Sequence, residues 1–405
     1  MEKPPSPMGT RFLHSAVLPH GSGRNDERGA AVLRTATPRI RSGVRRNDEL
    51  GPCTPRPDSP QTPVDAAGGR RQNGAMIDDP VLKNDWQAVG RAADLDEGGV
   101  MAARLFGTDL VLWRAGGEVM AWKDHCAHRG TRLSLGAVKD GQLACPYHAW
   151  HYNKEGRCTF IPAMPDLTPP AGARAETYCA REAYGFIWVS LGEPDRDVPP
   201  FPEWTDGAYR KQIVGPYNFR ANPFRTVENF IDIPHFPFVH PMINGDPSKP
   251  DLVEDYDVFE DEDGIGTGRV PIWQPFADHR GVPAMTHYTY RCFRPTTAYF
   301  AKETGDDNMF CMMLTVTPLA PDDCLVWLLV AINFGDQVTE QQIIDRQDKV
   351  FSQDKWIVES QRPAEIPLDL KDELHIRADK FSVAYRRWLK GMGLKWGVAE
   401  SARAS

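Results

Sequence analysis

Short apolar runs separated by turn residues fill the stretch from residue 85 to about 192. The runs are rich in Val, Ile, Trp and Phe and have the length of strands: LVLWRA (110–115), VMAWK (119–123) and GFIWVSL (185–191). Gly116-Gly117 and Asp140-Gly141 fall between such runs and are typical of tight turns between paired strands. The pattern predicts an all-β domain whose loops are carried on a rigid scaffold.

A proline-rich stretch, Glu193–Pro202, follows and is interpreted as an interdomain linker. Beyond it, longer apolar runs predict strands at YTYRCF (288–293), FCMMLTVTPL (310–319) and CLVWLLVAINF (324–334). A helical period instead runs from about Glu340 to Gln361. Projected at about 100° per residue, its apolar residues form one arc: Ile343, Ile344, Val350, Phe351, Ile357 and Val358.

The chain has 405 residues, which is enough for two or three domains. Its 41% hydrophobic residues, 25% charged residues and net charge of −8 are those of a globular protein and give no sign of nucleic-acid binding. No apolar run approaches the roughly 18 residues needed to cross a membrane. The eight cysteines are scattered rather than patterned, which favours free thiols in a cytoplasmic protein over a disulfide framework.

Residues 1–75 differ from the rest of the chain. They hold 12 Lys and Arg against 7 Asp and Glu, a net of +5, in a chain whose total is −8. Proline, glycine and arginine dominate, and no helical or strand period persists. Such a composition buries too little apolar surface to offset the entropy of ordering. We therefore interpret 1–75 as a disordered tail or as a mis-assigned extension ahead of a start at Met76.

Two Cys and two His occur in two pairs, Cys126-Ala-His128 and, after sixteen residues, Cys145-Pro-Tyr-His148. This ligand set can bind structural zinc or an iron–sulfur cluster. Zinc modules usually open with a pair of Cys and close with a pair of His, whereas here each half contributes one of each. Two thiolates can then hold one iron and two imidazoles the other, which is the Rieske arrangement of a [2Fe–2S] cluster. A zinc-stabilised binding module is the alternative.

A second group of possible metal ligands lies in VENFIDIPHFPFVHP (227–241). Asp232 and His235 are three residues apart, which would place them side by side on a helix. His240 comes five residues after His235 and would point away from it on an ideal helix of about 100° per residue. Pro237 lies between them and predicts a kink or an end of the helix, so that both imidazoles turn toward one point. The alternative is two buried histidines without a metal.

A two-histidine site for iron(II) also needs a carboxylate. In the predicted helix, Asp354 falls near the middle of the apolar arc, whereas Asp348 and Glu359 fall at its edge or beyond. A carboxylate inside an apolar face is expensive to bury unless it is paired or binds a metal. A buried salt bridge to Arg346 or Lys355 is the alternative, but those side chains project from other parts of the helix. Asp354 is therefore the predicted third ligand.

Together these motifs resemble the α (oxygenase) subunit of Rieske non-heme iron oxygenases. The motifs are Cys126/His128/Cys145/His148, Asn229-x₂-Asp232-x₂-His235-x₄-His240 and Gln353-Asp354. The resemblance runs from about Met76 to Gly393. It is strongest to the branch of vanillate O-demethylases, phenoxybenzoate and toluenesulfonate oxygenases and methylxanthine N-demethylases. Ala149 stands where many members have Gly, and we expect the added methyl group to leave cluster binding intact.

The resemblance implies an α+β chain, with an all-β Rieske domain at 76–195 and an antiparallel-sheet catalytic domain flanked by helices at 196–400. The implied cluster ligands are Cys126, His128, Cys145 and His148, and the implied ligands of a mononuclear iron(II) are His235, His240 and Asp354. Asp232 would bridge His235 to His148 of a neighbouring subunit and so carry electrons between the two centres. Asn229 would lie close to the mononuclear site, either with a direct role or as a packing or capping amide.

The activity that the resemblance implies is that of a terminal oxygenase. It would use O₂, with electrons from a flavin- and iron–sulfur-containing reductase or a ferredoxin, to hydroxylate or oxidatively demethylate a small aromatic or heterocyclic substrate. The implied assembly is a homotrimer or a dimer of trimers, with neither nucleic acid nor membrane as a partner. A Rieske-type electron carrier is the alternative function, but it would not need the second group of ligands.

The predicted strands of the second half are expected to form the wall of an apolar pocket. Tyr288, Tyr290 and Cys292 share one face by the period of two, and the pattern leaves open whether that face lines the pocket or the core. His287, Arg291 and Arg294 either anchor an acidic substrate or are solvated strand residues. The identity of the substrate and the type of oxygenation are left open.

Overall fold

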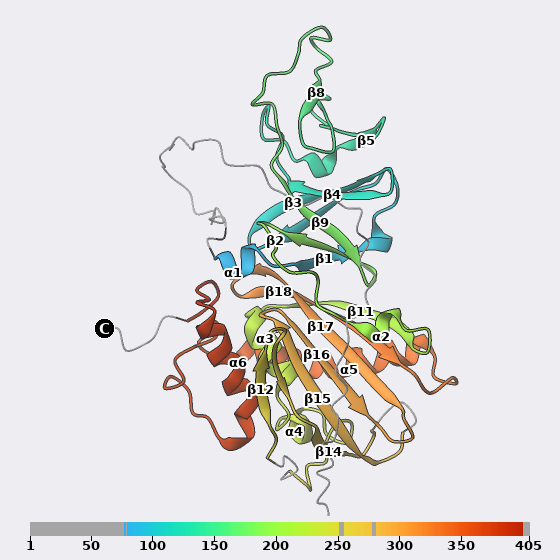
Figure 1. Cartoon of the computed structure of the whole chain (residues 1–405), viewed down its shortest axis with the longest axis vertical. Helices are drawn as coiled ribbons and strands as arrows, with labels where there is room; N and C mark the ends of the chain where they lie inside the picture. The colour runs from blue at the N-terminus through green and yellow to red at the C-terminus, as the bar shows by residue number, and fades with distance from the viewer. Residues whose placement is uncertain (1–76, 78, 251–254, 278–280, 400–405) are drawn as a thin grey trace, which may run out of the picture. The chain divides into compact units, whose positions relative to one another are not determined.

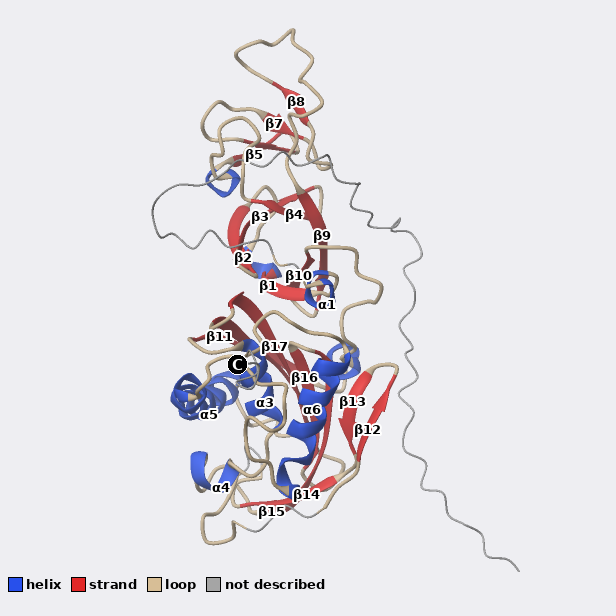
Figure 2. Ribbon diagram, turned by 90° about the vertical axis from the view of Figure 1, so that its left-hand side faces the viewer, coloured by secondary structure: helices blue, strands red, loops and turns tan. Residues whose placement is uncertain are grey.

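The computed structural model of the protein describes residues 77, 79–250, 255–277 and 281–399. The segment 1–75, predicted to be a tail or extension, lies outside the described residues. The described part contains two antiparallel β architectures in succession, the second covered by helices (Figures 1 and 2). The predicted fold class is therefore confirmed, while the domain limits 76–195 and 196–400 stay predictions.

The first architecture is a six-stranded sheet with the order β1-β10-β9-β4-β3-β2, and a small four-stranded sheet, β5-β6-β7-β8, is inserted in it. The bounds of the six strands are Gln87–Arg91 (β1), Val100–Leu105 (β2), Thr108–Ala115 (β3), Glu118–Lys123 (β4), Thr177–Ala183 (β9) and Phe186–Ser190 (β10). Those of the small sheet are Ala137–Lys139 (β5), Gln142–Ala144 (β6), His151–Tyr152 (β7) and Cys158–Phe160 (β8). Short helical turns accompany them at Pro80–Lys83 (α1), Ala92–Asp94 (η1) and Leu133–Leu135 (η2).

The predicted turns join neighbouring strands as expected. Gly116 and Gly117 connect β3 to β4 with φ of 61° and 75°, a left-handed conformation that glycine adopts without steric cost. Asp140 and Gly141 connect β5 to β6 in the same way, with φ of 50° and 73°. These hairpins fix the register of the strands, and the loops that carry the cysteine and histidine pairs begin and end on them.

The second architecture is an eight-stranded antiparallel sheet with the order β11-β18-β17-β16-β15-β13-β12, in which β14 pairs with β15. Its strands are Arg210–Phe219 (β11), Val258–Asp261 (β12), Gly264–Thr267 (β13), Val270–Gln274 (β14), Ala284–Arg294 (β15), Thr297–Glu303 (β16), Met309–Ala320 (β17) and Asp323–Ile332 (β18). Its helical segments are Pro202–Thr205 (α2), Pro223–Ile231 (α3), Phe236–Val239 (α4), Glu340–Ser360 (α5), Arg377–Asp379 (η3) and Lys380–Gly391 (α6). Helix α3 contacts β16 and β17 and lies between α5 and α6 (Figure 2).

The break in the first ligand helix is not where the sequence predicted it. Asp232 and His235 do not share a helix, because α3 ends at Ile231 and Asp232 has an extended ψ of 133°. Pro234 explains this end, since a proline disfavours helical conformation in the residue before it. Pro237, predicted to break the helix, instead lies in the first turn of α4, where its missing N–H has no partner to lose. Asp232 and His235 lie in the corner between α3 and α4, and the single turn of α4 separates His235 from His240.

The stretch predicted as a linker, Glu193–Pro202, runs between the two sheets and is held by polar contacts. Trp86 donates from its indole nitrogen to the carbonyl of Arg196, at 2.9 Å. Arg294, at the end of β15, donates to the carbonyl of Asp197 at 3.1 Å and to the carboxylate of Asp85 at 3.1 Å. The linker is therefore joined to residues next to β1 and at the end of β15 by partly buried hydrogen bonds.

The described residues contain no helix that is long and apolar enough to cross a membrane. Six cysteines in this part of the chain are free and buried: Cys126, Cys145, Cys158, Cys292, Cys311 and Cys324. Cys179 is disulfide-bonded, so the expectation of free thiols is wrong at this position.

Candidate active site

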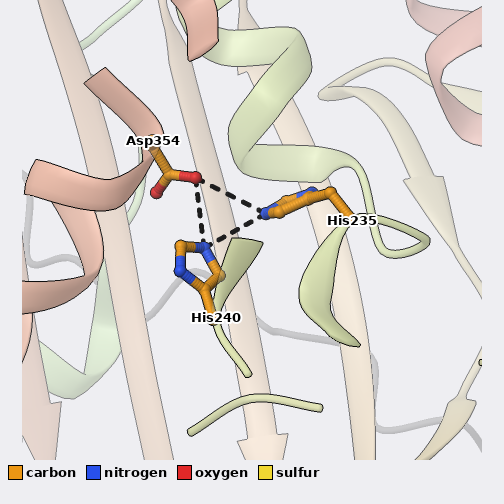
Figure 3. A group of neighbouring side chains, drawn as sticks. All are labelled: His235, His240 and Asp354. Carbon is orange, nitrogen blue, oxygen red and sulfur yellow. Dashed lines mark hydrogen bonds and ion pairs between the residues drawn. The ribbon is translucent and has the colours of Figure 1, made fainter. Parts of the chain in front are cut away.

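His235, His240 and Asp354 converge on one point, as Figure 3 shows. The Nε2 atoms of the two histidines are 3.3 Å apart. Asp354 Oδ1 lies 3.1 Å from Nε2 of His240 and 3.6 Å from Nε2 of His235. All three side chains are largely buried, so the arrangement is held by the protein interior.

Each member of this group is placed by its own local structure. His235 begins the short helix α4 and His240 ends it, so one helical turn separates the two rings. Asp354 lies on the buried face of α5. The helix begins with a capping box: the Thr339 hydroxyl accepts from the backbone N–H of Gln342, and the Gln342 side-chain oxygen accepts from the backbone N–H of Thr339. Asp354 is held opposite the two histidines because α5 packs against β11 and α3.

Neighbouring acceptors hold the two imidazole rings in one orientation. Nδ1 of His235 lies 2.8 Å from Oδ2 of Asp232, and Nδ1 of His240 lies 3.0 Å from Oε1 of Gln353. A carboxylate or amide oxygen can only accept, so each Nδ1 carries the proton and each Nε2 presents its lone pair. Gln353 is part of the motif found in the sequence, but its contact with His240 was not anticipated.

The converging atoms are therefore three acceptors: two imidazole lone pairs and a carboxylate oxygen. Acceptors at 3.1 to 3.6 Å repel one another unless a cation or a proton lies between them. Burial by itself would lower the pKa of His235, but the carboxylates of Asp232 and Asp354 outweigh it and raise that pKa. Two histidines and one carboxylate with space beside them are the ligand set of non-heme iron(II). The residues present thus fit a mononuclear iron.

The competing acidic residues of α5 lie elsewhere. Asp348 accepts a hydrogen bond from the hydroxyl of Tyr217 at 2.6 Å, and Glu359 accepts one from the backbone of Arg220 at 2.9 Å. Lys355, considered as a salt-bridge partner of Asp354, donates to the carbonyl of Asn218. Asn229 lies beside the site, with its amide nitrogen 3.4 Å from Oδ1 of Asp354.

Within the cysteine and histidine pairs, the two cysteines lie next to each other and so do the two histidines. Cys126 and Cys145 are buried, and the pKa of Cys145 is raised by that burial and by the neighbouring Cys126 thiol. The rings of His128 and His148 have their centroids 4.5 Å apart. Nδ1 of His128 is buried and, within the described part of the chain, has no hydrogen-bond partner. Two neighbouring thiols, two neighbouring imidazoles and an unsatisfied ring nitrogen are a donor set that fits a [2Fe–2S] cluster.

Two aromatic side chains support these loops. The hydroxyl of Tyr152 lies 3.1 Å from Sγ of Cys126, and the ring of Trp150 stacks on that of His128 at 4.4 Å. Ala149, the residue that departs from the family pattern, has a φ of 52°. That left-handed conformation explains why glycine suits the position, because an L residue with a Cβ is strained there.

A pocket opens beside His235, His240 and Asp354. The space inside it, counted together with its opening to solvent, is about 630 Å³. Aromatic rings dominate its wall: Phe230, Phe236, Tyr288, Tyr290, Phe300, Phe310 and Phe351. Its polar lining residues, apart from the metal-site group, are Asn229, Asn244, Lys302, Arg346 and Gln347.

The residues that line the pocket show which side chains of β15 border it and which belong to the core. Tyr288 and Tyr290 face the pocket, whereas Cys292 is buried outside its lining. Arg291 and Arg294 are paired with Asp261 and Asp85, and neither lines the pocket. The cations that do line it, Lys302 and Arg346, were not assigned to the pocket from the sequence. No local signal marks them, since strand pairing and helix packing bring them there.

Comparisons with known proteins agree with this architecture. Residues 85–171 match the model of the Rieske [2Fe-2S] domain, and residues 219–395 match the vanillate O-demethylase oxygenase C-terminal domain. The chain is 30% identical over 331 residues to methylxanthine N1-demethylase NdmA of Pseudomonas putida, a match that covers 78% of this chain and 91% of that protein. It is 28% identical over 340 residues to methylxanthine N3-demethylase NdmB of the same organism, covering 79% and 92%.

A solved structure gives the same result. The structure of Pseudomonas putida CBB5 NdmA with caffeine is similar with a TM-score of 0.66 at 29% identity, covering 76% of this chain and 90% of that one. The chain therefore belongs to the Rieske non-heme iron oxygenases, whose cofactors are a [2Fe–2S] cluster and a mononuclear iron. It is an enzyme, the terminal oxygenase component that hydroxylates or oxidatively demethylates a small aromatic or heterocyclic substrate.

Proposed function

We propose that His235, His240 and Asp354 are the ligands of the mononuclear iron and that the aromatic pocket beside them binds the substrate. The observation that carries this assignment is the convergence of three acceptor atoms in a buried place, which only a cation or a proton can stabilise. Iron(II) held by two histidines and a carboxylate supplies the oxygen-activating chemistry of this class. The pocket fixes which C–H bond of the substrate faces that site.

The chain's own side chains keep the site in one protonation state. Asp232 and Gln353 hold the protons of His235 and His240 on Nδ1, which leaves both Nε2 atoms free to ligate. The Asn229 amide, next to Asp354, steadies the oxygen of that carboxylate by a long contact of 3.4 Å. The aromatic wall excludes water from the reacting carbon and stacks against a flat ring.

For an O- or N-methyl substrate, the hydroxylated product breaks down without further help from the enzyme. One oxygen atom of O₂ enters the C–H bond to give –O–CH₂OH or –N–CH₂OH, while the other leaves as water after two electrons and two protons are taken up. The O–C or N–C bond of this hemiacetal or carbinolamine then breaks, releasing formaldehyde and the demethylated compound. Demethylation therefore needs the same site as hydroxylation.

We further propose that Cys126, His128, Cys145 and His148 ligate the Rieske cluster and that a separate reductase or ferredoxin supplies its electrons. We also propose a cytoplasmic homotrimer or dimer of trimers, in which the surface near the cluster ligands contacts another subunit. Leu135 and Tyr147 are apolar and 69% and 65% exposed, and both lie in the cluster-ligand loops. Such exposed apolar side chains beside a redox centre suit contact with another subunit.

An electron carrier without oxygenase activity would have no use for the second metal site or its pocket.

The experiment that tests this assignment combines metal analysis with single turnover. After anaerobic reconstitution, the protein should hold the two irons and two sulfides of a cluster plus one further iron per chain, with the visible spectrum of a Rieske centre. The reduced protein is then mixed with O₂ and a panel of aromatic acids, methyl ethers and N-methyl heterocycles. Formaldehyde or a hydroxylated product supports the proposal. A colourless protein that binds only zinc would contradict it.

A further inference from the structure

The hydroxyl of Tyr290 is a buried polar group without a partner. Tyr290 is fully buried and lines the pocket, yet its hydroxyl makes no hydrogen bond to any described residue. Its neighbour Tyr288 differs, because the Tyr288 hydroxyl accepts from the amide of Gln274 at 3.1 Å. Leaving a buried hydroxyl unsatisfied is unfavourable, because the group has lost its hydrogen bonds to water and gained none in exchange. An unpaired group of this kind in a binding pocket indicates a partner that arrives with the ligand.

The surroundings of Tyr290 are rigid and apolar. Its ring lies parallel to that of Tyr288 at 5.5 Å and within 5.7 Å and 6.2 Å of the rings of Phe300 and Phe381. Its backbone N–H donates to the hydroxyl of Thr267 at 3.1 Å, and β15 pairs it with Phe300 of β16. The ring is thereby fixed before any ligand binds, which reduces the entropy that binding must overcome.

The hydroxyl is a donor at neutral pH. Burial, with the nearby Tyr288, Asp232 and Tyr256, raises the pKa of Tyr290 well above its usual value. Only a molecule with a lone pair can satisfy the O–H, so a hydrocarbon ring at this place would leave it unpaired. Asp232 is the competing acceptor on the protein side, but among the described residues no hydrogen bond joins it to the Tyr290 hydroxyl, and its Oδ2 accepts from the ring and backbone N–H groups of His235.

We propose that Tyr290 donates a hydrogen bond to an acceptor oxygen on the substrate ring, and that the pocket thereby selects aromatic or heterocyclic substrates that carry a carbonyl or carboxylate. This inference rests on the proposed role of the pocket as the substrate site. Tyr290 is then the specificity-determining residue of the sheet side of the pocket. Selection arises because the ligand satisfies a donor that the free protein leaves unpaired.

The test is the affinity of Tyr290→Phe for paired probes. The first pair is 4-methoxybenzoate and 4-methoxytoluene, and the second is 1-methyl-2-pyridone and 1-methylpyrrole. Only the first member of each pair has the ring-borne carboxylate or carbonyl. Dissociation constants come from ligand-induced stabilisation of the iron-loaded protein under anaerobic conditions. Tyr290→Phe should weaken binding of the first members about tenfold and change the second members by less than twofold.

Tyr385→Phe is the matched control. Tyr385 is also fully buried, but its hydroxyl donates to the carbonyl of Pro295 at 2.6 Å and it does not line the pocket. This control should lower the melting temperature and leave all affinities unchanged, whereas Tyr290→Phe should melt at the wild-type temperature or above it. A Tyr290→Phe protein that melts lower with unchanged affinities would show a structural role and overturn the inference.

Two further outcomes separate a failure of this inference from a failure of the proposed function. A wild-type protein that binds neither acceptor-bearing probe more tightly than its partner overturns the inference, even if single turnover works on another substrate. Failure of the proposed function shows differently, as a protein without the third iron or without oxygen-dependent product. Because affinity is measured without turnover, the two failures are distinguishable.

Discussion

Asp354 is the residue on which the proposed iron site depends most. Its carboxylate is buried in the apolar face of α5 and faces two imidazole lone pairs, so the site without a cation carries an uncompensated repulsion. Asp348 lies on the same helix but is engaged by the Tyr217 hydroxyl. The two carboxylates of one helix are therefore expected to have different roles, which substitution can separate.

Asp354→Ala should lose the mononuclear iron and keep the cluster, because the two sites share no ligand. The measurement is iron per chain together with the visible absorption of the cluster, and turnover should fall below detection. Asp348→Ala is the control and should retain both metals with near-normal turnover. If Asp348→Ala is the variant that loses the labile iron, the assignment of the carboxylate ligand is wrong.

Ala149→Gly should stabilise the cluster loop. Ala149 has a φ of 52°, a conformation that costs an L residue about 1–2 kcal/mol and glycine almost nothing. The free energy of unfolding should rise by about 1 kcal/mol, measured as the urea midpoint at which the cluster bleaches. Ala180→Gly, inside β9 with ordinary backbone geometry, should lower the midpoint instead. Equal effects of the two substitutions would speak against strain at Ala149.

At the scale of elements, the periodicity of apolar residues predicted most strands and the long helix. The α3–α4 corner and the lining of the pocket depend on contacts between residues far apart in the sequence. The helix predicted from Glu340 to Gln361 is observed as Glu340–Ser360, and it packs against β11 and α3. The corner between α3 and α4 was misplaced, since Pro237 could break a helix or begin one and only the neighbouring Pro234 settles which. The pocket lining could not be predicted, because residues such as Lys302 and Arg346 reach it through strand pairing and helix packing.

The contact between Asp85, before β1, and Arg294, at the end of β15, predicts a pH dependence of stability. Burial raises the pKa of Asp85 from 3.8 to about 6, although Arg294 opposes the shift. Between about pH 4 and pH 6 the folded protein therefore holds a proton that the unfolded chain releases. Stability from this group is fully present below that window and is lost as the pH rises through it.

Urea unfolding from pH 4.5 to 6.5 measures this effect against Asp85→Asn, which cannot titrate. The wild type should lose stability relative to the variant as the pH rises, because the Asp85 carboxyl becomes charged in its buried place while the substituted amide stays neutral. A difference between the two proteins that stays constant across the range would exclude Asp85 as the titrating group.

At the scale of the whole molecule, the proposed function needs two metal centres to exchange electrons. Asp232 is the residue whose position suits this, because it holds His235 through Oδ2 while 26% of its side chain remains exposed. A carboxylate that only oriented the ligand would have no need to reach the surface. In the proposed oligomer, Asp232 would lie where one subunit's cluster meets another subunit's iron site, with the exposed Leu135 and Tyr147 of the cluster loops as apolar contacts.

Asp232→Asn separates the bridging role from a purely local one. If Asp232 bridges two subunits, the variant should keep the cluster, the mononuclear iron and the oligomer, yet lose nearly all turnover. The reason is that the neutral amide no longer acts as a charged acceptor between the imidazole of His235 and that of His148 in the neighbouring subunit. The reduced cluster should then reoxidise slowly when O₂ and substrate are supplied in a single turnover. A local role predicts a different result, in which the variant binds iron more weakly and its reoxidation follows iron occupancy. Normal reoxidation in an iron-replete oligomer of Asp232→Asn would therefore refute the bridge and leave Asp232 as a residue that only orients His235.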